Sequence, residues 1–456
     1  MKYADFSLVR FGTGLSPFMS GPERPDDLLA SLRATAVMER YPSVGTEAAS
    51  RLAAEYEEGV RAARERRPDG EALEKRTRDA LNDAVDRSHR SRLARALEDP
   101  TGFADRLVQF WSSHFSIRMT GPKRRVLTSA YYDDAIRANL TGRFADMLRA
   151  VTLHPAMLIY LDQTSSVGPR SRFALRRPKR RPGLNENHAR ELLELHTVGS
   201  GGAYTQSDVR QLAELMTGLM VDRSAAFMYQ TNRVEPGAET VLGVEYGGGR
   251  PPRLTEIEAF LEDISIHPDT AAHISYKLAR HFCADDPPTQ LVADLTQRFR
   301  ETDGDLMVLY DVLVRHREAR SSFGQKIRQP QDLITAWLRA LGVSGDEVMG
   351  WPRNRLHEMV LQPLIRMGQH WQGAPQPEGW PEEGDFWLTP QLLAMRIGWA
   401  MRQPGRLREN LPDPREFVAA AFGTTADDAV ASAAARAESL SDGVGIVLAS
   451  PQFNRR

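Results

Sequence analysis

The chain has 456 residues, with 59 Lys and Arg against 60 Asp and Glu, so its formal net charge is −1, and 41% of its residues are hydrophobic. This length and composition are typical of a folded protein with a substantial core, and they exclude disorder as its main state. The balanced charge also excludes a globally basic nucleic-acid-binding protein and an acidic tail protein.

The single cysteine, Cys283, excludes an intramolecular disulfide framework, a zinc site with three or four Cys ligands, and an iron–sulfur cluster held by one chain. An acid at Asp5 and the lack of an early apolar run predict that there is no signal peptide. No stretch approaches about 18 apolar residues, so we expect no membrane-spanning helix and no membrane partner. The expected compartment is the cytoplasm.

Apolar residues recur with helical spacing along most of the chain, which predicts a mainly α fold, built as one compound domain over residues 1–456. Charged helices are expected in residues 1–100, with a break at residues 67–70, a motif-bearing core in 101–320 and a helical part in 321–456. At most one small β hairpin is expected, near 225–245, where residues 227–229 and 240–242 have the composition of strands.

The first segment with candidate functional residues is the aromatic-rich stretch 110–117, which contains Trp111 and His114. The helical periodicity then stops, and residues 166–184 form a Pro-containing loop rich in basic side chains: Arg170, Arg172, Arg176, Arg177, Lys179, Arg180 and Arg181. This loop is either a solvated segment or a collector of an anionic substrate. No recognised nucleic-acid module accompanies it, so nucleic acid is not an expected partner.

The densest polar segment follows as Asn-Glu-Asn-His-Ala-Arg-Glu-Leu-Leu-Glu-Leu-His-Thr, over residues 185–197. At about 100° per residue, its Asn, Glu and Arg side chains share an arc of about 140°, with His196 on the opposite, apolar side. One interpretation is a surface helix with i,i+4 pairs between Glu186, Arg190 and Glu194. The other turns the polar face inward, where three carboxylates near Arg190 have their pKa values pushed apart, as acid–base chemistry requires.

A second helix, expected to open at residues 268–270, carries His273, Lys277 and His281 on one face. An ammonium group between two imidazoles argues against a metal and for solvent or an anion. Cys283 and His281 are two residues apart on this helix and diverge, so an inert thiol is expected.

Several of these segments together resemble a bacterial family known as domain of unknown function 1800. They are the motif at 185–199 and residues 110–115, 154–162, 204–209, 277–288, 379–388 and 450–453, so the resemblance covers essentially the whole chain. The resemblance implies a mainly helical fold and a companion protein with a sulfatase- or phosphatase-like fold, but no activity. Three positions depart from the family pattern: His188 replaces an aromatic residue or Leu, Leu219 replaces Trp, and Val234 replaces His.

The first functional hypothesis is a hydrolase-like enzyme with metal-free acid–base chemistry. It pairs Glu186 or Glu191 with His114, while Arg190 holds a polar or anionic substrate through its two-pronged donors. Paired carboxylates would also serve glycoside hydrolysis, and an acidic or sulfated glycan or a phosphate ester are candidate ligands. The predicted catalytic residues are His114, Glu186, Arg190, Glu191, Glu194 and His196, and the predicted substrate-binding residues are Asn185, Asn187, Trp111, Arg176 and Arg177.

Two alternatives remain open at this point. The first is a non-catalytic scaffold or partner protein, whose buried Asn–Glu–Arg–Glu network specifies one packing of the core. The second is an enzyme that binds Zn, Mn or Fe through His114, Glu191, Glu194 and His196, although Glu194 and His196 point about 160° apart on a helix. No metal ligand is assigned, and the sequence names no cofactor. Burial of the carboxylates distinguishes a scaffold from an enzyme.

Overall fold

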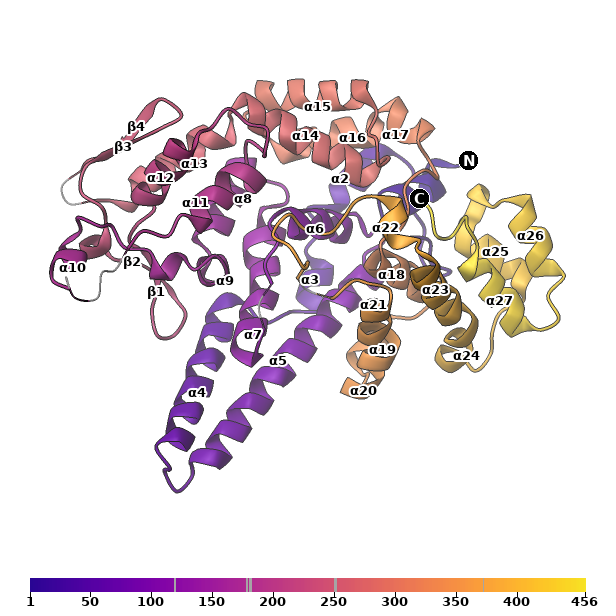
Figure 1. The fold of residues 1–456 in the computed structure, drawn as a ribbon. Coiled ribbons are helices and arrows are strands. Elements are labelled where there is room, and N and C mark those ends of the chain that lie inside the picture. The colour runs from indigo at the N-terminus through magenta and orange to yellow at the C-terminus, as the bar shows by residue number, and fades with distance from the viewer. Residues whose placement is uncertain (119, 178, 180–182, 250–251, 372) are drawn as a thin grey trace.

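A computed structural model gives the structure of residues 1–118, 120–177, 179, 183–249, 252–371 and 373–456. Figure 1 shows helices in every part of the molecule, with α6 (Phe103–His114) near its middle and the two ends of the chain close together. The mainly α fold is therefore confirmed. None of the helices formed by these residues is long and apolar enough to cross a membrane.

The N-terminal part consists of short helices followed by a long helical pair. The short helices are α1 (Tyr3–Arg10), α2 (Pro25–Ser31) and α3 (Ala36–Arg40), and the pair is α4 (Thr46–Arg64) and α5 (Gly70–Glu98). The pair projects from the rest of the molecule (Figure 1). The predicted helix break at residues 67–70 is confirmed, because α4 ends and α5 begins around it. At Gly59, a Cβ atom would lie 2.9 Å from Glu74 Cα, so glycine lets the two backbones approach.

The central helices bury the aromatic segment of α6. After α6 the chain forms α7 (Pro122–Tyr131), η1 (Tyr132–Ile136), η2 (Arg137–Asn139), α8 (Phe144–Leu153), α9 (Pro155–Tyr160), η3 (Gln163–Ser165) and α10 (Arg172–Leu175). Trp111 is fully buried, and its indole Nε1 donates a hydrogen bond to the Tyr310 hydroxyl at 2.8 Å. Its ring packs against Phe115 and Phe144. Such buried aromatic area holds α6 at the centre of the core.

The residues after the motif form two hairpins, where at most one was predicted. After α12 (Gln206–Leu215), β1 (Leu219–Val221) pairs with β2 (Phe227–Tyr229), and after η5 (Thr231–Arg233), β3 (Ala238–Val241) pairs with β4 (Val244–Gly247), both antiparallel. The predicted strands therefore pair with their own neighbours and not with each other. The reason is local: Leu242 and Gly243 both have positive φ and close a two-residue turn, although they lack the usual Asn-Gly signature.

The remaining helices cover the core and form a second apolar cluster. They are α13 (Leu254–Ser265), α14 (Pro268–Phe282), α15 (Thr289–Glu301), α16 (Leu306–Arg315), α17 (Arg317–Ser321), α18 (Pro330–Ala340), α19 (Gly345–Met349), α20 (Arg353–Leu356), η6 (His357–Leu361), α21 (Gln362–Arg366), α22 (Gly384–Trp387), α23 (Pro390–Arg402), α24 (Pro404–Leu407), α25 (Pro414–Phe422), η7 (Gly423–Thr425), α26 (Asp428–Ala435) and α27 (Leu440–Ala449). Trp337 and Trp399 stack at the centre of the second cluster, with ring centroids 4.4 Å apart. This cluster joins the end of α5 to the helices from α18 to α27.

Candidate functional site

The motif forms one helix with two different geometries. α11 (Asn187–Glu191) is α-helical and continues as a π-helical turn, η4 (Leu192–His196). Asn185 stabilises its start, because its Oδ1 accepts a hydrogen bond from the Asn187 backbone N–H at 3.0 Å and its Nδ2 donates to the Asp162 carbonyl at 3.3 Å. Asn187 Nδ2 in turn donates to the Leu161 carbonyl at 3.4 Å. π-helical turns are rare overall and are frequent at functional sites, although η1 and η6 are π-helical as well.

The first polar side chains of the motif form a network at the surface. Arg190 Nη2 donates to Glu186 Oε2 at 3.2 Å and to Gln206 Oε1 at 3.0 Å, and Gln206 Nε2 donates to Glu186 Oε2 at 2.8 Å. The ladder predicted for the α-helix does not continue to Glu194, since the wider π turn moves that side chain out of i,i+4 position. Glu186 and Arg190 therefore connect α11 to α12, which is the role that a scaffold requires.

The side chains of Glu191 and Glu194 lie outside this network. Both are half-buried, and neither has a hydrogen-bond or ion-pair partner among the residues that the structure describes. Burial, followed by the carboxylates of Glu194 and Glu378, raises the pKa of Glu191 to about 7, and Arg190 opposes the change. A carboxyl group that titrates near neutral pH both accepts and donates protons readily, which general acid–base catalysis needs.

Tyr160, the last residue of α9, lies beside Glu191. Burial raises the pKa of its phenol, and the carboxylates of Glu191 and Glu378 raise it further, while Arg118 lowers it. The carboxylates of Glu191 and Glu378 thus raise the pKa of Tyr160, and Glu378 also raises the pKa of Glu191. The end of α9, the motif helix and the segment before α22 therefore converge at Glu191.

The histidines of the predicted site are buried. His114 and His196 have ring centroids 6.2 Å apart, and His114 Nε2 lies 3.2 Å from the carbonyl oxygen of His196. Because a carbonyl only accepts, this Nε2 carries the proton. His114 Nδ1 and His196 Nδ1 are buried without a hydrogen-bond partner within the described part of the chain. Burial holds the pKa of His114 well below its usual range and that of His196 at about 3, so both rings are neutral at pH 7.

The proposed pairing of Glu186 or Glu191 with His114 is not formed. The charged or titratable neighbours that act on His114 are Lys277, His273 and His196, and none of them is a carboxylate. The ring packs instead between the rings of Phe110 on α6 and Phe115 just after it, whereas Glu191 is half-buried. The structure therefore separates the histidines from the carboxylates that the sequence placed together.

Lys277, on α14, is the cation that faces this region. Its ammonium group has no hydrogen bond or ion pair with any described residue. Burial lowers its pKa to about 8, and the Glu382 and Glu378 carboxylates oppose that shift. Glu378 therefore lies close enough to act on both Lys277 and Glu191. Glu378 thus affects both an amine and a carboxyl group whose pKa values lie near neutral pH.

Residues 378–384, named the strap here, carry Glu378 across the end of α6. The backbone N–H of Trp380 donates to Ser113 Oγ at 2.8 Å. Gly379 has φ +97°, and a Cβ atom there would lie 2.2 Å from the Ser113 carbonyl oxygen. Only glycine fits this close approach. The strap is therefore held against the residues that immediately precede His114.

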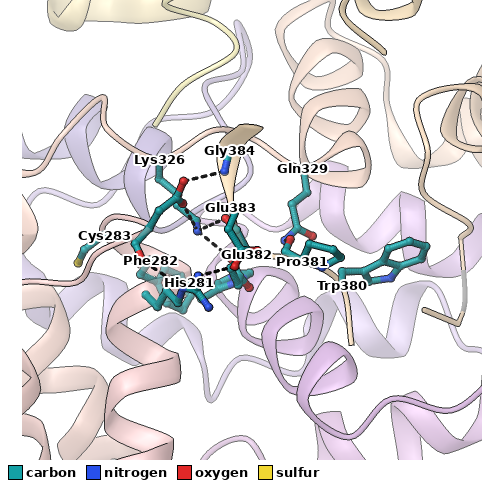
Figure 2. Close-up of polar contacts among 12 residues, drawn as sticks. His281, Phe282, Cys283, Lys326, Gln329, Trp380, Pro381, Glu382, Glu383 and Gly384 are labelled. Atoms are coloured by element: carbon teal, nitrogen blue, oxygen red, sulfur yellow. Dashed lines mark hydrogen bonds and ion pairs between the residues drawn. The ribbon is translucent and has the colours of Figure 1, made fainter. Parts of the chain in front are cut away.

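The other end of the strap is anchored by a polar cluster around His281 of α14 (Figure 2). Arg106 contacts His281 Nε2 at 3.1 Å, and since arginine only donates, His281 carries its proton on Nδ1 and donates it to Glu382 Oε1 at 2.7 Å. Lys326 Nζ lies 3.0 Å from Glu382 Oε2 and 2.8 Å from Asp285 Oδ1. Both nitrogens of His281 are occupied, so this histidine positions the strap and is not free to transfer protons.

The remaining predicted residues lie away from Glu191. Trp111 is enclosed in the core, so its indole presents no face to a ligand. The Arg177 guanidinium stacks 3.8 Å from the centroid of the Phe173 ring, and Arg176 is exposed on the same loop. Arg180 and Arg181 lie outside the described residues. Among the described residues, no group of three or more His, Cys, Asp or Glu side chains is placed to hold a metal ion, so the ligand set of the metal alternative is not assembled.

A family model described as "Protein of unknown function (DUF1800)" matches residues 10–455. The chain belongs to the DUF1800 family. The resemblance inferred from the motifs is thus confirmed over essentially the whole chain. Neither the curated proteins nor the solved structures contain a match. The DUF1800 description states no activity, so the function has to be argued from the site.

The three positions expected to depart from the family pattern, His188, Leu219 and Val234, lie outside the groups that act on Glu191 or Lys277. His188 is fully buried, both ring nitrogens lack a hydrogen-bond partner in the described structure, and burial lowers its pKa to about 3. It therefore occupies an apolar core position. Leu219 is also fully buried, and Val234 packs close to Gly218 on the wall of a separate cavity.

Sequence reasoning assigned no chemistry to Tyr160, Glu378, Glu382 or Lys326. The sequence did point towards the first three, because each lies in or beside a segment that resembles the family, namely 154–162 or 379–388. Sequence analysis gave these two segments no functional role. Lys326 lies in no such segment, and its position between two carboxylates depends entirely on the fold.

Proposed function

We propose that this DUF1800 protein is a hydrolase-like enzyme in which Glu191 transfers protons and Lys277 stabilises negative charge on the substrate. One observation carries the proposal: Glu191 and Lys277, both without partners among the described residues, are linked through Glu378, and their pKa values of about 7 and about 8 lie near neutral pH. Perturbed groups of this kind concentrate at functional sites.

Each group has a stated role in this proposal. Glu191 acts as general acid or base, and burial together with the nearby Glu194 carboxylate keeps its pKa high. Lys277 supplies a positive charge that is not neutralised by a bonded carboxylate, so it favours a substrate that is anionic or becomes anionic in the transition state. Tyr160 lies beside both carboxylates and orients polar groups of the substrate. His114 is neutral and enclosed, so it supports the site and takes no proton.

The substrate class that fits is polar or anionic, such as a phosphate or sulfate ester or an acidic glycan. The ammonium of Lys277 replaces Arg190 as the anion-holding group, because Arg190 is engaged by Glu186 and Gln206. A companion protein with a sulfatase- or phosphatase-like fold remains a prediction from the family resemblance.

The test is a hydrolysis screen with chromogenic carboxylate, phosphate and sulfate esters and glycosides. The wild type should hydrolyse at least one class, and Glu191→Gln should lower kcat/KM by about 100-fold or more. The matched control is Glu186→Gln, which removes a carboxylate from the same helix and should change kcat/KM by no more than about threefold. Full activity of Glu191→Gln on the best substrate would refute the assignment.

The scaffold alternative retains one specific observation, the paired network of Glu186, Arg190 and Gln206. If the network alone matters, Arg190→Met should weaken the contact of α11 with α12, and Glu191→Gln should have no effect on any reaction. Failure to hydrolyse any class in the screen, together with unchanged reactivity of Lys277 towards electrophiles in Glu191→Gln, would favour the scaffold.

A further inference from the structure

The C-terminal part has a groove between two helical segments that lie side by side, η6 with α21 on one side and α23 with α24 on the other (Figure 1). Its volume is about 470 Å³. Each segment lines it with side chains at helical spacing, such as Gln362 and Arg366 on one side and Met395, Trp399 and Arg402 on the other. The groove therefore runs between two rows of side chains and is not a closed cavity.

The one carboxylate among the described lining residues is already paired. Glu358 Oε1 accepts a hydrogen bond from Arg406 Nη2 at 2.6 Å, and this ion pair joins η6 to α24 across the groove. His357 also lines the groove, and its Nε2 accepts a hydrogen bond from Gln362 Nε2 at 3.1 Å, as a neutral imidazole does. Neither Glu358 nor His357 is thus available to neutralise a further cation.

Two guanidinium groups of the groove carry positive charge that no carboxylate neutralises. Arg366 and Arg402 are both exposed, and neither has a hydrogen bond or an ion pair with any described residue. A Cβ atom at Gly398 would lie 2.7 Å from Arg402 Nη2, so the glycine lets this guanidinium lie against the surface of α23. The two charges stand on opposite walls, since Arg366 belongs to α21 and Arg402 to α23.

Apolar side chains lie between these charges. Met395 is 37% exposed and is the open apolar side chain of the groove, while Trp399 and Met367, at 3% and 1% exposed, close its floor. Methionine side chains adapt to many shapes and are common at surfaces that bind helices. Further exposed apolar side chains of the same two helices are Ile365, Leu393 and Ile397. Apolar area that is left in water here is available for burial by a partner.

The shape of the groove favours a protein segment over a lipid surface. A membrane is contacted by side chains that protrude, whereas a groove between two helices accommodates a ridge, such as the apolar face of a third helix. Such a helix needs carboxylates on both sides of its apolar stripe, because the unpaired guanidinium groups stand on both walls.

We infer that this groove binds an acidic amphipathic helix of a partner protein, with its apolar stripe on Met395 and its carboxylates towards Arg366 and Arg402. Guanidinium groups bind carboxylates through paired hydrogen bonds, which would fix the direction and register of the helix. The groups that act on the pKa of Glu191 are not among the described residues that line the groove, so this surface is separate from the acid–base site.

The test is fluorescence anisotropy of the full chain with a labelled helical peptide of about 18 residues, with Leu at i, i+3, i+4 and i+7 and Glu on both sides of that stripe. Two matched peptides carry Lys in place of Glu, or the same residues with the leucines dispersed around the helix. The acidic amphipathic peptide should bind at least about tenfold more tightly than either. Equal binding of the Lys peptide would overturn the role of the arginines, and equal binding of the dispersed peptide would overturn the role of the apolar floor. Absence of binding at millimolar concentration, or binding only to phosphatidylglycerol vesicles, would overturn the inference.

Charge-reversal variants locate the binding. Arg402→Glu and Arg366→Glu should each weaken binding of the acidic peptide by about tenfold or more and strengthen binding of the Lys peptide, which loss of structure would not do. Arg300→Glu, at an exposed position on α15, makes the same charge change elsewhere and should bind both peptides as the wild type does. If one groove variant does not fold, the other decides the question. Unchanged binding by a folded groove variant would overturn the location.

Discussion

Replacing His188 by Leu should remove a large part of the acid sensitivity of the fold. His188 is fully buried, both its ring nitrogens are without hydrogen-bond partners among the described residues, and its pKa is lowered by burial from 6.5 to about 3. As the pH falls below 6.5, the unfolded chain takes up a proton at this position and the folded chain does not. The stability that neutral His188 allows is therefore present above pH 6.5 and is lost as the pH falls towards 3.

The magnitude follows from the two pKa values. At pH 5, which is about 1.5 units below the unfolded pKa, protonation of the unfolded state costs about 2 kcal/mol of folding free energy, at about 1.4 kcal/mol per unit. The His188→Leu variant lacks this cost. At pH 7.5 the variant should be at least as stable as the wild type, because Leu removes two buried polar atoms that have no partner.

Urea titrations at pH 7.5, 6.0 and 5.0 measure this effect as the difference in unfolding free energy between variant and wild type. That difference should grow by about 2 kcal/mol in favour of the variant between pH 7.5 and pH 5.0. His357→Leu is the matched control, since the His357 imidazole is exposed to water in the folded chain and its removal should leave the pH dependence unchanged. A wild-type-to-variant difference that does not depend on pH would refute the burial of neutral His188.

The other predictions concern the site and the strap. Glu191→Gln should stabilise the protein increasingly as the pH rises, because the raised pKa of Glu191 means that stability is lost between pH 4.5 and about pH 7. Thermal unfolding at pH 4 and pH 8 should therefore show a much larger gain at pH 8, and an equal gain at both would contradict it. The rate at which trinitrobenzenesulfonate modifies Lys277 should rise with pH with a midpoint near pH 8. Peptide mass spectrometry can follow Lys277 by itself, because the chain has only six lysines. A midpoint near pH 10.5 would count against the site. Lys326→Met leaves the largely buried Glu382 carboxylate without its cation, so it should cost about 3–5 kcal/mol and speed proteolysis in the strap. Resistance to proteolysis equal to that of the wild type would show that the anchor is dispensable. Gly379→Ala should displace the strap from Ser113, and with it Glu378, so the pKa of Glu191 should return towards 4.5. The pH dependence of the unfolding free energy measures this change. An unchanged pH dependence would show that the strap does not influence Glu191.

Local patterns were sufficient for the class of fold and for the motif helix. Helical spacing of apolar residues predicted the helices, and the turn residues at 67–70 predicted the break between α4 and α5. The pairing of strands was beyond these patterns, because the turn at Leu242 and Gly243 adopts positive φ without a recognisable signature. The π turn at Leu192–His196 was equally hidden, and it moves Glu194 out of the predicted ladder with Arg190.

The sequence by itself determined that the chain is mainly helical, that it belongs with the DUF1800 proteins and that Glu191 and Glu194 are candidate acid–base groups. Only the tertiary structure decided which groups surround them. Glu378 reaches Glu191 because the strap is clamped to His281 and Ser113 from distant helices, and His114 is withdrawn from the carboxylates because aromatic packing encloses its ring. The physical reason is that a pKa depends on burial and on charges brought close in space, and neither quantity is encoded in the spacing of residues along one helix.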